Sequence, residues 1–350
     1  THCISSAASD VYKRQIWNKA LPVINGAFSP DGGPKANYTT NLNMCETSNK
    51  GFELALNTRN IITKNFTWSS SVTFNHNKEK ITKLSGGDSD VLNNGDTGYA
   101  LALGEAINSY YHYKLDGVWQ KGEETDAAVF GAAPGDLKIN IPNLVKESDG
   151  RFYKIDEETG SAAVDENGNV IYYTSDNKYT PSDADYQILG HNSPDWSLGF
   201  QNNFTWKDFD LSVFVYARYG QMFAYDMLTS YDPKGIRNFP TYFNYWTENN
   251  PSNDFPAANA NKGLEQYTGY YALRYVDGSF IKIKNITLGY SLPKSILKSA
   301  GIEKCRFYAT ITNPFVFAKS HLLKDYDPEM NGSLKYPLTK QFVFGVNVTF

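Results

Sequence analysis

The side chains best suited to binding another molecule lie in two long polar segments, residues 121–195 and 220–278. The second segment is rich in aromatic residues, and some of them are the candidate contacts for a ligand or a covering protein: Tyr225, Tyr231, Tyr242, Tyr245 and Trp246. Aromatic rings of this kind stack on sugar rings or pack against a partner. They can equally pack the segment against itself, and the sequence leaves both interpretations open.

The first segment contains alternating oxygen-bearing side chains at Asp165, Asn167 and Asn169. Such spacing occurs in calcium loops, but an EF-hand loop needs glycine at its sixth place and glutamate at its twelfth. Counted from Asp165, those places hold valine and aspartate. The run Val164–Val170, with a glycine at Gly168, instead predicts a β-hairpin. We expect no metal and no cofactor here.

Catalytic chemistry is not indicated by any motif in the chain. The HExxH, GxSxG and GxxxxGK[ST] motifs are absent, and the 5 histidines are isolated. The 3 cysteines are too few for a disulfide framework. A net charge of -4 and a pI of about 5.8 give no basic patch for nucleic acid. We therefore expect neither an enzyme nor a nucleic-acid-binding protein.

The elements that must position these segments are β-strands, because the dominant hydrophobic period from Gly51 onward is two. In residues 196–206 large apolar side chains alternate with serine, glycine and amides, and residues 66–75 and 341–350 repeat the pattern. Each run is about ten residues long, as a tilted membrane-spanning strand requires. The mean hydropathy of -0.47 excludes a transmembrane helix but not a barrel, whose strands average polar and apolar faces.

A soluble β-sandwich also alternates, but two features favour a membrane barrel. The polar faces carry long rows of hydroxyls, amides and glycines, as a wet lumen allows, and aromatic residues gather near strand ends. Short and long connections should then alternate, with long loops outside the cell and short turns in the periplasm. A count of eight strands breaks this alternation, and a further strand at 97–104 restores it.

The predicted fold class is therefore all-β, an antiparallel transmembrane β-barrel with long extracellular loops. We expect about nine strands, with boundaries good to a few residues: 51–61, 66–80, 97–104, 108–120, 196–206, 209–219, 279–292, 304–317 and 341–350. Nine strands do not close a transporter-sized barrel, which has roughly 22. Because lipid does not tolerate an open sheet edge, we expect the chain to be part of a larger wall.

The two ends of the chain carry different signals. Residues 1–15 read like translated adapter DNA, and we interpret them as a foreign tail rather than part of the fold. Residues 16–350 are then the C-terminal part of a barrel domain. The last strand ends on an aromatic residue, with apolar side chains at alternate positions that form a candidate barrel-assembly signal: Phe342, Phe344, Val348 and Phe350.

Several stretches, in this order, resemble the C-terminal part of SusC/RagA-family TonB-dependent outer-membrane transporters. They are residues 49–53, 110–118, 133–138, 188–190, 194–196, 209–212, 279–293, 312–314, 326–329 and 336–350. Among them are Ser279-Phe-Ile-Lys-Ile-Lys-Asn-Ile-Thr-Leu-Gly-Tyr-Ser-Leu-Pro293 and Tyr326-Asp-Pro-Glu329. Single pieces are weak, but their order and coverage together are specific.

The resemblance implies import of a large nutrient, an oligosaccharide or a peptide, across the outer membrane of a Gram-negative bacterium. It implies a SusD-like surface lipoprotein as lid, the TonB complex as energy source, the barrel-assembly machinery and outer-membrane lipid as partners, and a plug domain that this chain lacks. Two alternatives stay open at this point. One is a plug-less structural or adhesive barrel, and the other is a soluble β-sandwich that binds carbohydrate.

Overall fold

The computed structural model describes residues 2–10, 15–21, 38–84, 91–94, 99–230, 241–298 and 301–350. One large antiparallel sheet, which we call the wall sheet, has the order β1-β3-β4-β14-β15-β18-β19-β20, with β2 also paired to β3. Its strands are β1 (His2–Asp10), β2 (Gln15–Leu21), β3 (Tyr38–Ile62), β4 (Phe66–Leu84), β14 (Trp196–Trp206), β15 (Phe209–Tyr219), β18 (Phe280–Ser291), β19 (Lys304–Ala318) and β20 (Gln341–Thr349).

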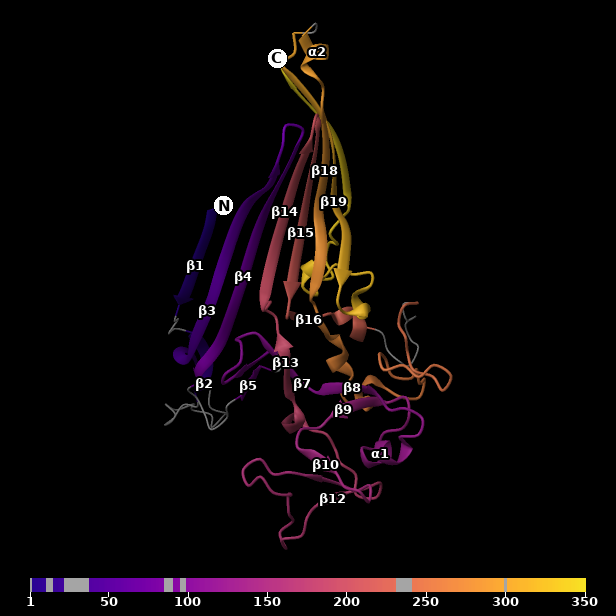
Figure 1. Cartoon of the computed structure of the whole chain (residues 1–350). Coiled ribbons are helices and arrows are strands. Elements are labelled where there is room, and N and C mark those ends of the chain that lie inside the picture. Colours follow the sequence, from indigo (N-terminus) through magenta and orange to yellow (C-terminus); the bar gives the residue numbers. More distant parts are fainter. Residues whose placement is uncertain are drawn as a thin grey trace, which may run out of the picture.

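The wall sheet has two unlike ends (Figure 1). From β3 onward, the connections at residues 63–65, 207–208 and 292–303 are short and lie at the upper end, which we call the turn end. The alternate connections, 85–195, 220–279 and 319–340, are long and lie at the lower end, the loop end. The predicted alternation of short and long connections is thereby confirmed.

Register places apolar side chains beside one another across the wall sheet. Trp196 on β14 stacks between Phe74 of β4 and Tyr219 of β15, with ring centroids 6.0 and 5.5 Å away. On the opposite face, polar side chains meet, as where the Gln201 amide donates to the Ser212 hydroxyl at 2.7 Å. Because successive residues point to opposite faces of a strand, one face is predominantly apolar and the other predominantly polar.

The apolar face carries one polar interruption. Asn202 on β14 and Ser70 on β4 are both buried there, and the Ser70 hydroxyl donates to the Asn202 side-chain oxygen at 2.8 Å. The indole N–H of Trp68 donates to the same oxygen at 3.0 Å, and the Asn60 amide donates to Ser70 at 2.8 Å. Polar groups in an apolar setting are costly unless paired, and these groups pair with each other.

The long connections fold into small sheets at the loop end. Their strands are β5 (Val91–Asn94), β6 (Tyr99–Ala102), β7 (Ser109–His112), β8 (Lys114–Val118), β9 (Leu137–Asn140), β10 (Leu144–Lys146), β11 (Phe152–Lys154), β12 (Tyr172–Tyr173), β13 (Gln187–His191), β16 (Met222–Ala224) and β17 (Tyr275–Asp277). They form the sheets β13-β7-β6-β5, β8-β9, β10-β11-β12 and β16-β17. We call this whole region the loop assembly.

Helices are few and short. They are α1 (Glu124–Val129), α2 (Lys294–Leu297) and the 3-10 helices η1 (Asp183–Asp185), η2 (Asp226–Thr229), η3 (Leu264–Gln266), η4 (Tyr270–Arg274), η6 (His321–Leu323) and η7 (Pro328–Met330). No helix in the described ranges is long and apolar enough to cross a membrane.

Two predicted wall strands are wrong. Residues 97–104 contribute only β6, which pairs with β5 and β7, and residues 108–120 divide into β7 and β8, which belong to different sheets. The other seven predicted strands correspond to β3, β4, β14, β15, β18, β19 and β20, although β3 begins at Tyr38, well before the predicted residue 51. The all-β antiparallel fold is confirmed, while the interpretation of residues 1–15 as a foreign tail stays a prediction.

Candidate functional site

The loop assembly has a hydrophobic core of its own, which we call the loop core. Its side chains come from three separate stretches of sequence, and the buried members are Val118, Leu137, Phe223, Tyr225, Leu228, Phe243, Trp246, Phe255, Tyr267, Tyr270, Leu273, Val276 and Leu323. The rings of Phe243 and Phe255 stack with centroids 4.2 Å apart, and those of Tyr225 and Tyr326 lie 4.4 Å apart. Such packing fixes the long connections relative to one another.

The five candidate contact residues have different positions. Tyr225 and Trp246 are 6% and 8% exposed within the loop core, and the Trp246 indole N–H donates to the Gln120 side-chain oxygen at 3.0 Å. Tyr242 packs against the core, Tyr245 is 41% exposed, and Tyr231 lies outside the described residues. Self-packing therefore accounts for Tyr225 and Trp246 in this structure, whereas ligand contact by any of the five stays a prediction.

A buried group of charges fastens the last connection to the wall sheet. Lys282 on β18 is 0% exposed, and its Nζ lies 2.5 Å from Asp327 Oδ2 and 2.8 Å from Glu329 Oε2. Lys284 reaches the other Glu329 oxygen at 2.6 Å. Burial alone would raise the pKa of the Glu329 carboxyl, but hydrogen bonds from both lysines outweigh it and hold that pKa below its usual value. We call these four residues the ion clamp.

The ion clamp also positions the loop core. Asp327 caps the N-terminus of η7 and Glu329 lies within it, and the adjacent Tyr326 ring packs on Tyr225 and on Phe223. The Gln221 amide donates to Asn331 just beyond the turn, at 2.7 Å. The same few residues thus hold both the wall strand β18 and the aromatic core.

A second buried charge holds together the part of the loop assembly farthest from the wall sheet. Asp185 is completely buried and accepts hydrogen bonds from Lys154 Nζ and the Tyr179 hydroxyl, each at 2.6 Å. Burial would raise the pKa of the Asp185 carboxyl, but these two donors lower it below its usual value. The carboxylate is therefore fully matched and offers no free group for chemistry.

A half-buried histidine at the end of β7 lies among tyrosines. His112 stacks on Tyr186 with a centroid separation of 4.8 Å, and the backbone N–H of Tyr113 donates to its Nδ1 at 2.9 Å. Burial, helped by the charge of Arg274, lowers the pKa of His112 to about 4, although Asp183 acts in the opposite direction. The imidazole is therefore neutral near pH 7.

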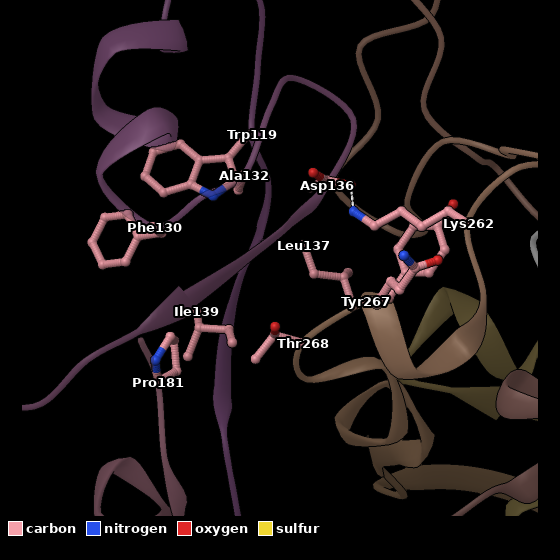
Figure 2. Close-up of a pocket in the computed structure, with 11 residues that line it drawn as sticks. Trp119, Phe130, Ala132, Asp136, Leu137, Ile139, Pro181, Lys262, Tyr267 and Thr268 are labelled. Carbon is pink, nitrogen blue, oxygen red and sulfur yellow. Dashed lines mark hydrogen bonds and ion pairs between the residues drawn. The ribbon is translucent and has the colours of Figure 1, made fainter. Parts of the chain in front are cut away.

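A small pocket separates residues 119–139 from residues 262–268 (Figure 2). Its volume is about 40 Å³, and the Asp136–Lys262 ion pair, at 2.6 Å, faces across it. At this size the pocket has no room for a nutrient of several sugar or amino-acid units. It is a seam between two connections rather than a nutrient site.

A larger cavity of about 440 Å³ lies between β13, β8 and the loop core. Its lining includes aliphatic side chains, two tyrosines and a few polar groups: Tyr113, Lys114, Leu115, Gly117, Gln187, Ile188, Leu189, Met222, Asn253, Asp254, Ala272, Leu273, Tyr275 and Leu322. This size falls in the range of sites that bind small molecules or short polymer segments. We call it the β13 cavity.

The predicted hairpin at Val164–Val170 is confirmed. Val164 and Val170 form an antiparallel bridge, and Asp165 Oδ1 accepts the backbone N–H groups of Asn167 and Asn169, each at 2.9 Å. Gly168 has a φ of +84°, the left-handed conformation that favours glycine. Within the described ranges no group of three or more His, Cys, Asp or Glu side chains is placed to hold a metal ion.

The candidate assembly signal lies on β20, the last strand of the wall sheet. Its apolar side chains stand on one face and are exposed, Phe350 following the strand at 86% exposure. This arrangement agrees with the predicted alternation. Recognition of Phe342, Phe344, Val348 and Phe350 by assembly machinery stays a prediction.

Sequence reasoning missed the ion clamp and the β13 cavity. A signal for the clamp exists, because Lys282 and Lys284 stand two residues apart in a strand and Asp327 and Glu329 stand two apart around a proline. What the sequence lacks is any sign that these two pairs meet. The cavity depends on contacts among four separate segments and leaves no local signal.

Comparison with known proteins supports the predicted resemblance. No family model matches the chain. The chain is 28% identical over 330 residues to TonB-dependent receptor P3 of Formosa agariphila, covering 88% of this chain and 29% of the relative. It is 26% identical over 345 residues to TonB-dependent receptor SusC of Bacteroides thetaiotaomicron, covering 95% of this chain and 29% of the relative. The chain thus spans less than a third of these relatives' length.

Solved structures with a similar fold include the RagAB peptide transporter, with a TM-score of 0.63 and 24% identity over 89% of this chain and 30% of the other. The RagAB peptide importer in its 'open-open' state gives a TM-score of 0.67 and 19% identity, over 99% of this chain and 32% of the other. The chain therefore has the fold of part of a TonB-dependent transporter barrel, and the resemblance to the SusC/RagA family is confirmed. The similar proteins are receptors and transporters, not enzymes, as expected.

Proposed function

We propose that the chain forms part of the wall and the external mouth of an outer-membrane transporter that imports a large nutrient, an oligosaccharide or a peptide. The observation that carries this proposal is the strict alternation of connections in the wall sheet. Short turns gather at one end, while the long connections at the other end form a packed assembly with its own core. Outer-membrane barrels show this asymmetry, with short periplasmic turns and longer extracellular loops.

The partners follow from the same proposal. The apolar face of the wall sheet contacts outer-membrane lipid, and the loop end faces the exterior of a Gram-negative cell, where a SusD-like lipoprotein covers the mouth. TonB acts through a plug that lies outside this chain. The names of the similar proteins, TonB-dependent receptor, SusC and RagAB peptide importer, support these roles.

Uptake by the full-length protein tests the proposal. The complete gene and its neighbouring lipoprotein gene would be expressed in a Gram-negative host that lacks its own large-nutrient transporters. Fluorescein-labelled mixtures of oligosaccharides and of peptides would then be offered with and without a protonophore. We expect uptake of one class, abolished by the protonophore because TonB depends on the proton-motive force.

The two alternatives predict other results. A structural or adhesive barrel assembles in the outer membrane but takes up neither mixture. A soluble carbohydrate-binding sandwich is recovered without detergent. Either result would contradict the proposed function.

A further inference from the structure

A row of aromatic side chains crosses the apolar face of the wall sheet near its loop end. The row consists of Phe52 on β3, Phe74 on β4, Trp196 on β14 and Tyr219 on β15, and successive ring centroids lie 5.5, 6.0 and 5.5 Å apart. In outer-membrane barrels, such aromatic girdles lie at the interface between the hydrocarbon and the headgroups. Under the proposed function, this row marks the level at which lipid tails end and headgroups begin.

Three exposed lysines stand just beyond this row, on its loop-end side. Lys50 on β3 and Lys78 on β4 are register partners, and Lys50 shares a face with Phe52, two residues away. Lys80 follows on the same face of β4. Directly opposed residues of an antiparallel pair have Cβ atoms about 4.5–5.5 Å apart, and diagonal ones about 7–8 Å. The three ammonium groups therefore share one small area, which we call the lysine patch.

The lysine patch differs from another lysine above the same aromatic row. Lys319 lies over the Tyr219 ring, 5.0 Å from its centroid, and its Nζ pairs with Asp277 at 2.7 Å. Within the described ranges, none of the three patch lysines forms an ion pair. The patch therefore presents positive charge that the described part of the chain does not match.

Carboxylates of the same two strands do not supply the missing charge. Glu79 stands between Lys78 and Lys80 in sequence, so its side chain points to the opposite face. Glu46 shares the face of the patch but is the register partner of Lys83. Like charges directly opposite each other destabilise an antiparallel pair. An external anion between the patch lysines would remove this cost.

We propose that the lysine patch binds the phosphate group of an anionic membrane lipid in the leaflet on the loop side. The phosphate lies between Lys50 and Lys78, with Lys80 as a third donor, while the acyl chains cover the aromatic row. Basic clusters beside a membrane bind anionic headgroups in this way. A lipid fits better than a soluble anion, because its chains also cover the apolar side chains below. This inference rests on the outer-membrane placement of the wall sheet under the proposed function.

Lipid titration of the full-length transporter in detergent micelles tests the inference. Native mass spectrometry would measure binding of dioleoyl phosphatidic acid and of dioleoylglycerol, which has the same chains but no phosphate. Phosphatidic acid should bind roughly tenfold or more tightly. Added salt should weaken its binding, because the lysines are exposed and their charges are screened. Millimolar inorganic phosphate at constant ionic strength should leave it unchanged.

Variants of the patch test the location. The triple change Lys50→Gln, Lys78→Gln and Lys80→Gln should weaken binding of phosphatidic acid roughly tenfold or more, because it removes all three charges. Arginine at the same three positions should keep the affinity, since a guanidinium group also donates to phosphate.

A control triple removes the same charge from the other end of the wall sheet. Lys64, Lys294 and Lys298 are exposed in the turn-end connections. Their change to glutamine should leave the affinity for phosphatidic acid unchanged. Circular dichroism would verify that each variant is folded.

Three results would overturn the inference while leaving nutrient import intact. The two lipids could bind equally, which excludes recognition of phosphate. The folded patch variant could keep its affinity, or the control could lose as much, which places the lipid elsewhere. Inorganic phosphate could displace the lipid, which assigns the patch to a soluble anion. Failure of the uptake assay with both nutrient mixtures, with lipid binding unchanged, would instead remove the import function and keep the lipid site.

Discussion

The wall sheet and the loop assembly bury apolar side chains in opposite ways. In the loop assembly, aromatic and aliphatic residues such as Phe223, Leu228 and Phe255 are almost completely buried among each other. In the wall sheet, Phe317, Phe344 and Ile281 stand exposed on the apolar face. The loop assembly is thus a small globular unit, whereas the wall sheet is a single layer whose apolar face is left uncovered by the described residues.

The comparison shows that different interactions define the structures of the two regions. Backbone ladders and register define the wall sheet. Packing and buried charges define the loop assembly. A substitution should therefore disturb one region without the other, and the following predictions test that separation.

Deletion of Phe350 should have the largest effect, and only on assembly of the wall. Phe350 directly follows β20, the last strand of the wall sheet, at the end of the sheet away from the loop core. As the terminal residue of the candidate assembly signal, its loss should block insertion of the full-length protein into the outer membrane. Surface labelling of intact cells measures this directly. Normal surface levels would contradict the assembly signal, and Leu338→Ala, at another exposed position, is the control.

Lys282→Ala should loosen the link between the two regions. Removal of Lys282 leaves Asp327 partly buried without its cation and leaves Glu329 with Lys284 alone, so the cost should be below the about 3–5 kcal/mol typical of a fully buried pair. Limited proteolysis of the full-length protein should then cut the connection 319–340 while leaving the wall strands intact. Lys319→Ala, which removes a solvent-exposed pair with Asp277, should give no measurable change. Equal protection of both variants would show that the clamp does not hold the connection.

Trp246→Ala should destabilise the loop core by about 3 kcal/mol, because it leaves a cavity and unpairs the Gln120 oxygen. Tyr245→Ala should hardly change stability, because Tyr245 is half-exposed. Thermal unfolding followed by near-UV circular dichroism separates the two. If only Tyr245→Ala weakens nutrient binding, Tyr245 is a contact residue and Trp246 a packing residue. If neither variant changes the affinity for the nutrient, both residues serve only in packing.

Acidification should lower the stability of the loop assembly by less than the Trp246→Ala substitution does. The pKa of His112 is about 4 in the folded chain against 6.5 for an ordinary histidine, so the neutral ring stabilises the fold above pH 6.5. That contribution is lost as the pH falls from 6.5 towards 4, because the unfolded chain binds the proton first. The unfolding midpoint measured across this range should fall less steeply in His112→Gln, and identical slopes would contradict the assignment.

The wall sheet could be predicted from sequence because its signal is local. Alternation in residues 196–206 and 341–350 identifies each strand by itself, and strand length matches a membrane crossing. The two wrong strands arose because the alternation of short and long connections can be restored in two ways. A count of eight strands breaks the alternation of connections, and either adding one strand at 97–104 or removing the one at 108–120 restores it. The structure takes the second solution.

The reason lies in tertiary contacts that sequence does not display. β6 is only four residues long, and Ala100, Leu101 and Ala102 are all buried in a row, which marks a strand covered on both faces rather than a wall strand. The candidate contacts show the same limit. Composition indicated an aromatic binding region in 220–278, but it could not separate Trp246, inside the core, from Tyr245, at its surface.

The buried pair of Ser70 and Asn202 has a consequence for how such a wall is built. The two residues are 132 positions apart, yet the Ser70 hydroxyl donates to the Asn202 side-chain oxygen on the apolar face of the sheet. Carried into a bilayer separately, each would bring an unpaired polar group into hydrocarbon. Under the proposed barrel assignment, the pairing of β4 with β14 removes that cost, because the two side chains meet only when these strands are neighbours in the wall sheet.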